Sequence, residues 1–175
     1  PSPVPDDELE IFCKNVAHLD LFQPRSIRQE YTEPLPDEVH EDLMMAIYDP
    51  YEVPEHTPIL WYMALRACRK FHQAHGRYPG TPLDSSSYQD DVPLLQTCIN
   101  QVIEELRMGD VDLVQTTLGN AERKYATEMT RYANAELHNV ASVVGGVASQ
   151  EAVKLITGQY VPFNHTYIYN GIAST

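Results

Sequence analysis

The most constraining feature of this sequence is a long, almost uncharged helical stretch followed by one short β-type segment. A helix is predicted over 136–157, and it carries almost no charge from Leu137 to Ser149. The pair Gly145–Gly146 lies inside it, although each glycine destabilises a helix by roughly 1 kcal/mol relative to alanine. A helix that is apolar on nearly every side is typical of a protein interior. We therefore expect this helix to be buried in the intact protein, with its glycines packed closely against another backbone.

The segment after this helix is β-branched and aromatic. Gly158 is expected to end the helix, and the residues from Thr166 to Tyr169 predict a strand. Side chains alternate along a strand, so Tyr167 and Tyr169 would share one face. A single strand cannot form a sheet by itself. Its partner strands must lie in another part of the protein, and we expect this sequence to be a fragment of a larger one.

Amphipathic patterns with a helical period dominate the rest of the chain. They predict helices over about 5–23, 37–48, 58–75, 91–107 and 118–133. Pro58 suits the first turn of the helix over 58–75, and Gly76 suits its end. The segment 77–90 is rich in proline, glycine and serine, and it is predicted to be a loop.

The apolar residues of these helices predict where the core lies. The apolar face of 58–75 consists of Leu60, Met63, Ala64, Ala67 and Phe71. The apolar face of 91–107 consists of Leu95, Cys98, Ile99, Val102 and Leu106. We expect residues 1–133 to form one compact helical domain and residues 134–175 to form a separate unit. The predicted fold class is therefore mainly α.

Composition and charge exclude several classes of protein. Apolar residues make up 43% of the sequence, which is enough for a real core. The net charge is −13, with 25 acidic and 12 basic residues, so the basic stripe of a nucleic-acid binder is absent. No run of about 18 apolar residues predicts a membrane span, and no signal peptide pattern is present. Three widely spaced cysteines fit a reducing compartment, so we expect a cytoplasmic and nuclear location.

No motif in the sequence predicts catalysis. Cys13, Cys68 and Cys98 all lie on apolar helical faces, so we interpret them as core residues. His72 and His75 could face one metal ion, but no Cys, Asp or Glu lies at a companion spacing. The glycine pair in the string VVGGVASQE lacks the order of a phosphate-binding loop. We therefore expect no catalytic, cofactor-binding or metal-ligating residue in this chain.

Two long strings resemble a known family. They are YMALRACRKFHQAHGRYPG, from Tyr62 to Gly80, and HNVASVVGGVASQEAVKLITGQYVPFNHTYIYNG, from His138 to Gly171. Together with the shorter strings FCKN and RSIRQEY, they resemble the C-terminal part of the regulatory subunit of the heterodimeric neddylation (ubiquitin-like protein) activating enzyme. The likeness covers most of the sequence, with gaps at 34–57 and 105–120.

This resemblance implies both a fold and a function. The family pairs with a catalytic subunit to activate a ubiquitin-like modifier by ATP-dependent adenylation and thioester formation, and the ATP, the magnesium and the thioester cysteine belong to that partner. Residues 1–133 would be the inserted helical domain, similar to a catalytic-cysteine region. Residues 134–175 would be the C-terminal helix and strand of an α/β adenylation-type (ThiF/MoeB-like) domain. The alternatives are an independent helical interaction module, a catalytically competent activating enzyme, and a regulatory subunit for a different modifier.

Overall fold

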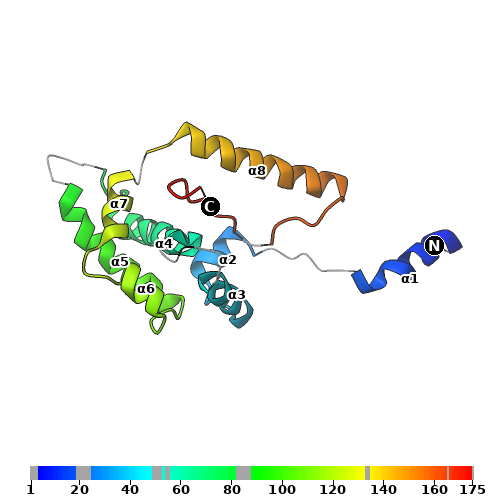
Figure 1. Cartoon of the computed structure of the whole chain (residues 1–175), viewed down its shortest axis with the longest axis horizontal. Helices are drawn as coiled ribbons and strands as arrows, with labels where there is room; N and C mark the ends of the chain where they lie inside the picture. The colour runs from blue at the N-terminus through cyan, green and yellow to red at the C-terminus, as the bar shows by residue number, and fades with distance from the viewer. Residues whose placement is uncertain are drawn as a thin grey trace.

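The computed structural model describes residues 4–18, 25–48, 53, 56–81, 88–132, 135–164 and 166–174. Within these residues every regular element is a helix, which confirms the mainly α prediction. Helices α2 to α7 gather into one block, α8 (His138–Thr157) runs beside it, and α1 (Asp6–Asn15) stands apart (Figure 1). No helix in the described part of the protein is long and apolar enough to span a membrane.

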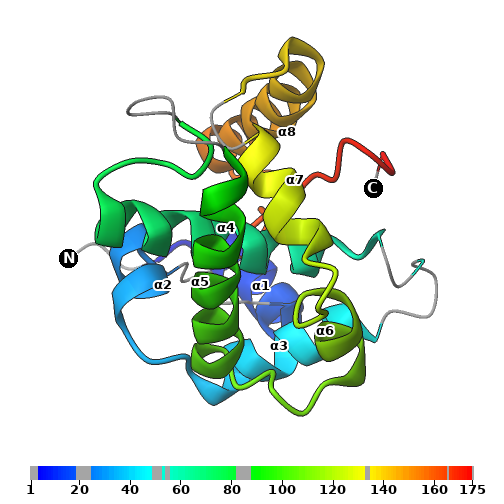
Figure 2. The same ribbon diagram turned by 90° about the vertical axis from the view of Figure 1, so that its left-hand side faces the viewer.

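The core of the block lies between α4 (Pro58–His75) and α5 (Asp91–Glu105). All the residues predicted for the two apolar faces are buried, including Phe71 and Ile99, which are fully buried. Figure 2 shows α5 crossing in front of α4, with α7 lying against this pair. The helical spacing of these two faces therefore located the core correctly.

The ends of α4 follow the sequence signals. Pro58 occupies the first turn, where a missing N–H breaks no helical hydrogen bond. Gly76 closes the helix in the left-handed conformation, with φ of 70°, and its N–H donates to the His72 carbonyl at 2.8 Å. The backbone then turns through residues 77–81. Most of the remaining predicted loop, 82–87, lies outside the described residues, and it is followed by the short 3-10 helix η3 (Tyr88–Asp90).

Two helices pack beneath α4. Helix α3 (Asp37–Ile47) matches the helix predicted over 37–48 and buries Ile47 in the core. Helix α2 (Ile27–Thr32) was not predicted, although its start carries a recognisable signal. Ser26 accepts a hydrogen bond from the backbone of Gln29, and the Gln29 side chain accepts one from the backbone of Ser26. This reciprocal capping box is visible in the sequence as Ser-x-x-Gln.

The prediction of one helix over 118–133 is wrong. The structure has a shorter helix there, α7 (Lys124–Tyr132), and a separate helix just before it, α6 (Asp112–Thr117). The N–H groups of Leu118 and Gly119 both donate to the Val114 carbonyl, at 2.9 and 3.0 Å, and this tight turn ends α6. The prediction failed because it treated the Gly119–Asn120 turn signal as helix interior.

Helix α1 is shorter than predicted and contributes nothing to the core. It ends at Asn15 and continues as the 3-10 helix η1 (Val16–His18), while the rest of the predicted helix to residue 23 lies outside the described residues. None of its residues is buried. The interpretation of Cys13 as a core residue is therefore wrong, because the apolar face that carries Cys13 has no packing partner among the described residues.

The last part of the protein has the predicted helix but not the predicted strand. Helix α8 ends at Gly158, which is left-handed with φ of 62°. Residues 166–170 form no regular structure, so the strand predicted from Thr166 to Tyr169 is wrong for this structure. The physical reason is that a strand exists only by pairing, and no second β-segment is present in the described residues. The division at residue 133 into two domains stays a prediction.

Candidate interaction surface

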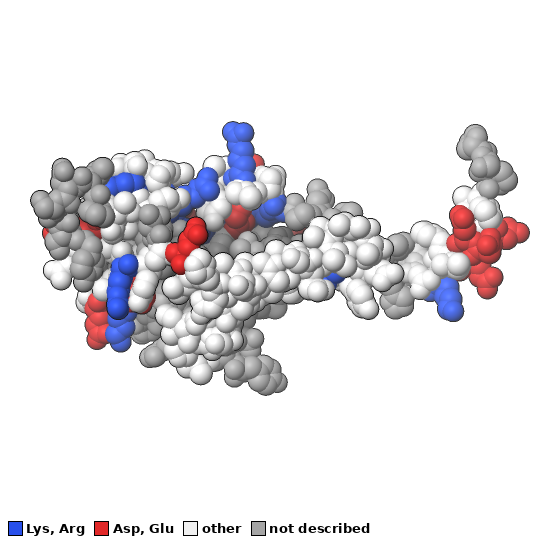
Figure 3. Space-filling model, turned by 90° about the horizontal axis from the view of Figure 1, so that it is seen from above, with Lys and Arg blue, Asp and Glu red and all other residues white. Residues whose placement is uncertain are grey.

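Helix α8 presents a continuous apolar surface. It buries none of its residues, and its large exposed side chains are Val143, Val144, Val153, Leu155 and Ile156. Figure 3 shows this helix as an almost uncharged band, in contrast to the acidic start of α1. Gly145 and Gly146 have no atom within 4 Å of the position where a Cβ would lie. The burial predicted for α8 and the close packing of its glycines are therefore not found among the described residues.

The segment after α8 folds back and contacts the second half of the helix. The N–H of Phe163 donates to Glu151 Oε2 at 2.6 Å, and Lys154 Nζ donates to Glu151 Oε1 at 2.6 Å. The hydrogen bond from Lys154, assisted by the one from Phe163, lowers the pKa of the Glu151 carboxyl. The Phe163 ring stacks on the Tyr167 ring at 5.6 Å between centroids. These contacts fix the path of the backbone toward residues 166–174.

Asn170 then anchors this segment to the helical block. Its side chain is buried, and its Nδ2 donates to the His56 carbonyl at 3.0 Å, just before α4. Its Oδ1 accepts from the N–H groups of Ile172 and Ala173 at 3.0 and 3.4 Å. The C-terminal segment therefore connects α8 to the helical block through the Asn170 side chain and through Ile168, which packs against the core.

The segment 166–169 has a backbone that is open to pairing. Among the described residues, its N–H and C=O groups make no hydrogen bond to another backbone group. Cavities of about 450 and 390 Å³ lie beside it, and Ile168 lines both of them. Unpaired backbone groups flanked by apolar cavities are the features that an added strand requires.

A second arrangement joins the string from Arg77 to Gly80 to α5. The Arg77 guanidinium binds the Asp91 carboxylate through two hydrogen bonds of 2.5 and 2.6 Å, and the Gly80 N–H donates to the same carboxylate at 2.9 Å. The hydrogen bond from Arg77 is the main cause of the lowered pKa of Asp91, and it raises the pKa of Arg77. All three hydrogen bonds to Asp91 come from the turn after α4, so this arrangement fixes that turn against the start of α5.

The remaining candidate residues are spread over the molecule. Cys68 and Cys98 are buried, as predicted, and burial raises the pKa of the Cys68 thiol to about 12, which disfavours the nucleophilic thiolate. The His72 ring lies against Tyr78, and the His75 ring lies against Phe71. In the part of the protein that the structure describes, no three His, Cys, Asp or Glu side chains are grouped around a metal position.

Comparisons with known proteins bear on these surfaces. No family model matches the sequence. The NEDD8-activating enzyme E1 regulatory subunit of Danio rerio is 34% identical over 175 residues, which is 100% of this chain and 30% of that protein. The same subunit of Gallus gallus is 33% identical over 175 residues, covering 100% of this chain and 29% of that protein. The predicted resemblance to these regulatory subunits is confirmed.

The matched region covers only part of each relative, and one relative is named for a different modifier. The 175 residues span about three tenths of the length of these relatives. A more distant relative, the SUMO-activating enzyme subunit 1 of Dictyostelium discoideum, is 25% identical over 167 residues, or 93% of this chain and 47% of that protein. Both the helical block and the α8 surface lie inside the matched region, so the surfaces described above belong to the shared part of these proteins.

Proposed function

We propose that this chain is part of the regulatory subunit of a neddylation-activating enzyme, which pairs with a catalytic subunit. The observation that carries the proposal is the similarity of the whole sequence, at 34% identity, to a subunit named for that role. The pair would activate a ubiquitin-like modifier by ATP-dependent adenylation followed by thioester formation. The ATP, the magnesium and the thioester cysteine would belong to the catalytic subunit, and the protein would work in the cytoplasm and nucleus.

The exposed α8 surface supports an assignment of each part of the molecule. The block from α2 to α7 has its own core and would be the helical domain inserted in the subunit. Helix α8 would cover the sheet of an α/β adenylation-type (ThiF/MoeB-like) domain supplied by the rest of the polypeptide. The unpaired segment 166–169 would then add to that sheet as a strand. Covering α8 would also give Gly145 and Gly146 the close neighbours that they lack among the described residues.

The same proposal assigns no catalytic step to this chain. Cys68 and Cys98 are buried thiols, and burial raises the pKa of both. Cys13 is exposed on α1, and among the described residues no base forms a hydrogen bond with its thiol. We therefore expect neither ATP–pyrophosphate exchange nor thioester formation from this subunit alone.

Two alternative functions can be compared with the exposed surface of α8 and with the relatives. An independent helical interaction module would need no further polypeptide, yet it would leave the apolar residues of α8 exposed to water. A regulatory subunit for another modifier is represented by the SUMO-activating relative, which is 25% identical to this sequence. The NEDD8-activating relative of Danio rerio is 34% identical. The neddylation assignment is the better supported one.

Reconstitution tests the proposal directly. The full-length protein would be mixed with the catalytic subunit of a neddylation-activating enzyme and, as the matched control, with that of a SUMO-activating enzyme. We expect a stable heterodimer and modifier-dependent ATP–pyrophosphate exchange only with the first. Exchange by the protein alone, or preferential pairing with the second, would refute the assignment.

A further inference from the structure

The C-terminal segment, residues 166–174, lies between α8 and the helical block and contacts both (Figure 1). Among the described helices, α8 is closely packed against none of the others. The cavity of about 390 Å³ is lined by α4 and α7 together with Leu137 and Val140 at the start of α8, so these helices leave space between them. The contacts of the C-terminal segment therefore matter for how α8 lies relative to the block.

Consecutive residues of this segment contact the two parts. Gly171 lies against the first turn of α8, since a Cβ on it would be 2.9 Å from Val140 Cγ2. Asn170 contacts the block through its hydrogen bond to the carbonyl that precedes α4. Just before the segment, the Phe163 N–H is bound by Glu151 of α8. Asn170 is thus the place where a stretch of chain that contacts α8 at two points is bonded to the block.

The His56 carbonyl is open to Asn170 for a local reason. It precedes α4, and Pro58 in the first turn of that helix has no N–H to donate. The Leu60 N–H donates to the Thr57 carbonyl instead, at 3.1 Å. Among the described residues, no backbone N–H donates to the His56 carbonyl. Asn170 therefore satisfies an acceptor that the start of the helix leaves unpaired.

The amide of Asn170 uses both of its polar groups. Its Oδ1 accepts from the N–H groups of Ile172 and Ala173, which leaves the Nδ2 end to face the His56 carbonyl. An amide can do both because it carries a donor and an acceptor, whereas a carboxylate only accepts. The side chain is 4% exposed, so water hardly competes for these bonds. One side chain therefore joins a local turn to the start of α4.

Ile168 makes the other contact with the block, but that contact is not directional. It packs against the core, and it also lines the cavities of about 450 and 390 Å³, which leave room for its side chain to shift. Apolar contact depends on buried area and not on direction. A hydrogen bond weakens steeply when it is misaligned. Ile168 therefore contributes adhesion, whereas Asn170 contributes position.

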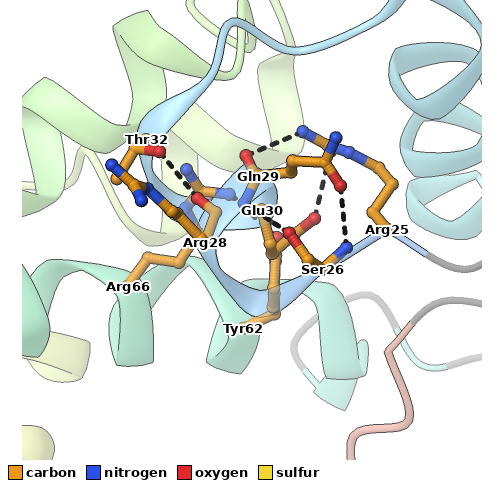
Figure 4. Close-up of polar contacts among 8 residues, drawn as sticks. All are labelled: Arg25, Ser26, Arg28, Gln29, Glu30, Thr32, Tyr62 and Arg66. Atoms are coloured by element: carbon orange, nitrogen blue, oxygen red, sulfur yellow. Dashed lines mark hydrogen bonds and ion pairs between the residues drawn. The ribbon is translucent and has the colours of Figure 1, made fainter.

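Contacts inside the block are more numerous. Helix α2 is held on α4 by the ion pair of Arg66 with Glu30 at 3.3 Å (Figure 4) and by the Arg66 guanidinium over the Tyr31 ring at 5.3 Å. In contrast, the bond from Asn170 is the only side-chain hydrogen bond between the described residues of 135–174 and the block. Its loss would leave no polar side-chain contact to replace it there.

We propose that Asn170 is the positioning residue that fixes how the helical block lies relative to α8. This role rests on contacts within the chain and not on the proposed pairing with a catalytic subunit. If α8 covers a sheet, as proposed above, the same hydrogen bond also sets the position of the block relative to that sheet.

The test measures the distance between two spin labels in the full-length protein by double electron–electron resonance. The labels replace Gln101 of α5 and Gln159 after α8, two exposed polar residues, and they are attached through a bio-orthogonal amino acid that leaves the cysteines unlabelled. Asn170→Asp keeps an acceptor for the turn but has no donor for the His56 carbonyl at neutral pH. It should broaden the distance distribution at least about twofold relative to the parent.

The matched control is Asn120→Asp, because Asn120 makes the same two kinds of hydrogen bond inside the block. Its Oδ1 accepts from the Glu122 N–H at 2.7 Å, and its Nδ2 donates to the Thr116 carbonyl at 3.0 Å. This variant should leave the width of the distribution unchanged. Ile168→Ala should lower the midpoint of thermal unfolding and broaden the distribution less than Asn170→Asp does.

A second pair of variants avoids a buried carboxylate, which could prevent folding. Asn170→Ala should also broaden the distribution while its thermal unfolding curve shows a folded protein, and Asn120→Ala should not broaden it. An unchanged width in a folded Asn170 variant, equal broadening in the matched Asn120 variant, or greater broadening by Ile168→Ala would each overturn the positioning role.

Discussion

At the scale of single residues, Gly80 lies in the turn after α4, at a point that α7 approaches closely. Its φ is +76°, a conformation that residues with a Cβ rarely adopt. A Cβ at this position would lie 1.8 Å from the Thr130 carbonyl oxygen of α7. Its N–H also donates to Asp91 at the start of α5. A larger residue is therefore excluded here both by conformation and by space.

Replacing Gly80 should be costly. Gly80→Ala would force either the turn or α7 to move, and strained backbone conformations alone cost about 1–3 kcal/mol. We expect its free energy of unfolding, measured with urea, to fall by at least about 2 kcal/mol. Gly109→Ala is the matched control, because nothing lies within 4 Å of that position and its φ is not positive. Similar losses in both variants would show that close approach to Thr130 is not the cause.

Asp91 gives a second prediction at this scale. Asp91→Ala removes two hydrogen bonds to Arg77 and one to Gly80, and a hydrogen bond to a charged group contributes about 1.5–3 kcal/mol. We expect a loss of about 2–4 kcal/mol in the free energy of unfolding. Asp110→Ala, at an exposed aspartate in a turn, should change it by less than about 0.5 kcal/mol. A small effect of Asp91→Ala would mean that the turn is held by packing alone.

The pH dependence of that effect has a defined sign. The pKa of Asp91 is lowered in the folded state by Arg77 and Gly80, so the unfolded state binds its proton more readily. The stabilisation is fully present above the unfolded pKa of about 3.9, and it is lost as pH falls through the lower folded pKa. The difference in unfolding free energy between the parent and Asp91→Asn should therefore be larger at pH 7 than at pH 3. A difference that grows on acidification would contradict this assignment.

At the scale of elements, the sequence predicted helices best where apolar spacing and end signals agree. In helix α4 the apolar stripe agrees with the end signals Pro58 and Gly76, so the first and the last residue of the helix both match the prediction. The turn after Leu118 and the capping box at Ser26 are also signals in the sequence, and both mark helix boundaries that apolar spacing alone does not predict. The exposure of Cys13 and the absence of a strand at 166–169 could not be predicted, because amphipathic and alternating patterns do not say whether a packing partner is present.

The glycine pair of α8 distinguishes the 175-residue polypeptide from the larger protein. In the 175 residues alone, Gly145→Val and Gly146→Val meet no neighbouring atom, so we expect unchanged or slightly higher helix content by circular dichroism. In the full-length protein, where α8 is proposed to be covered, each should cost about 1–3 kcal/mol through overpacking. Heterodimer formation should weaken in parallel. Ala148→Val, one turn away on the same helix and exposed, is the matched control. Full-length variants as stable as the parent would refute close packing.

At the scale of the whole molecule, stability is unevenly distributed. The buried residues lie between Ile47 and Asn170, and most of them belong to α4, α5 and the segment up to α7. Helix α1 has ten residues and buries none of them, and an isolated helix of this length is marginal in water. The acidic first turn of α1, with Asp6, Asp7 and Glu8, stabilises its start but cannot replace a packed face.

Limited proteolysis should report this distribution. We expect trypsin to cut after Lys14 in α1 first and after Arg77 late, since the latter side chain is held by Asp91. Mass spectrometry of the time course gives the order of cleavage. In Asp91→Ala the cut after Arg77 should come earlier while the cut after Lys14 keeps its rate. Early cleavage at Arg77 in the parent protein would contradict the predicted order.

The uncovered surface of α8 also has a consequence for how the protein is made. Residues 138–157 follow the helical block in the sequence, so they leave the ribosome after the block, at about 5–20 residues per second. The helical block can complete its core during synthesis, whereas α8 stays exposed until another surface covers it. Copies that find no cover keep an apolar surface that chaperones and proteases recognise. The cellular amount of the 175 residues alone should therefore be lower than that of the full-length protein, in which the proposed sheet can cover α8.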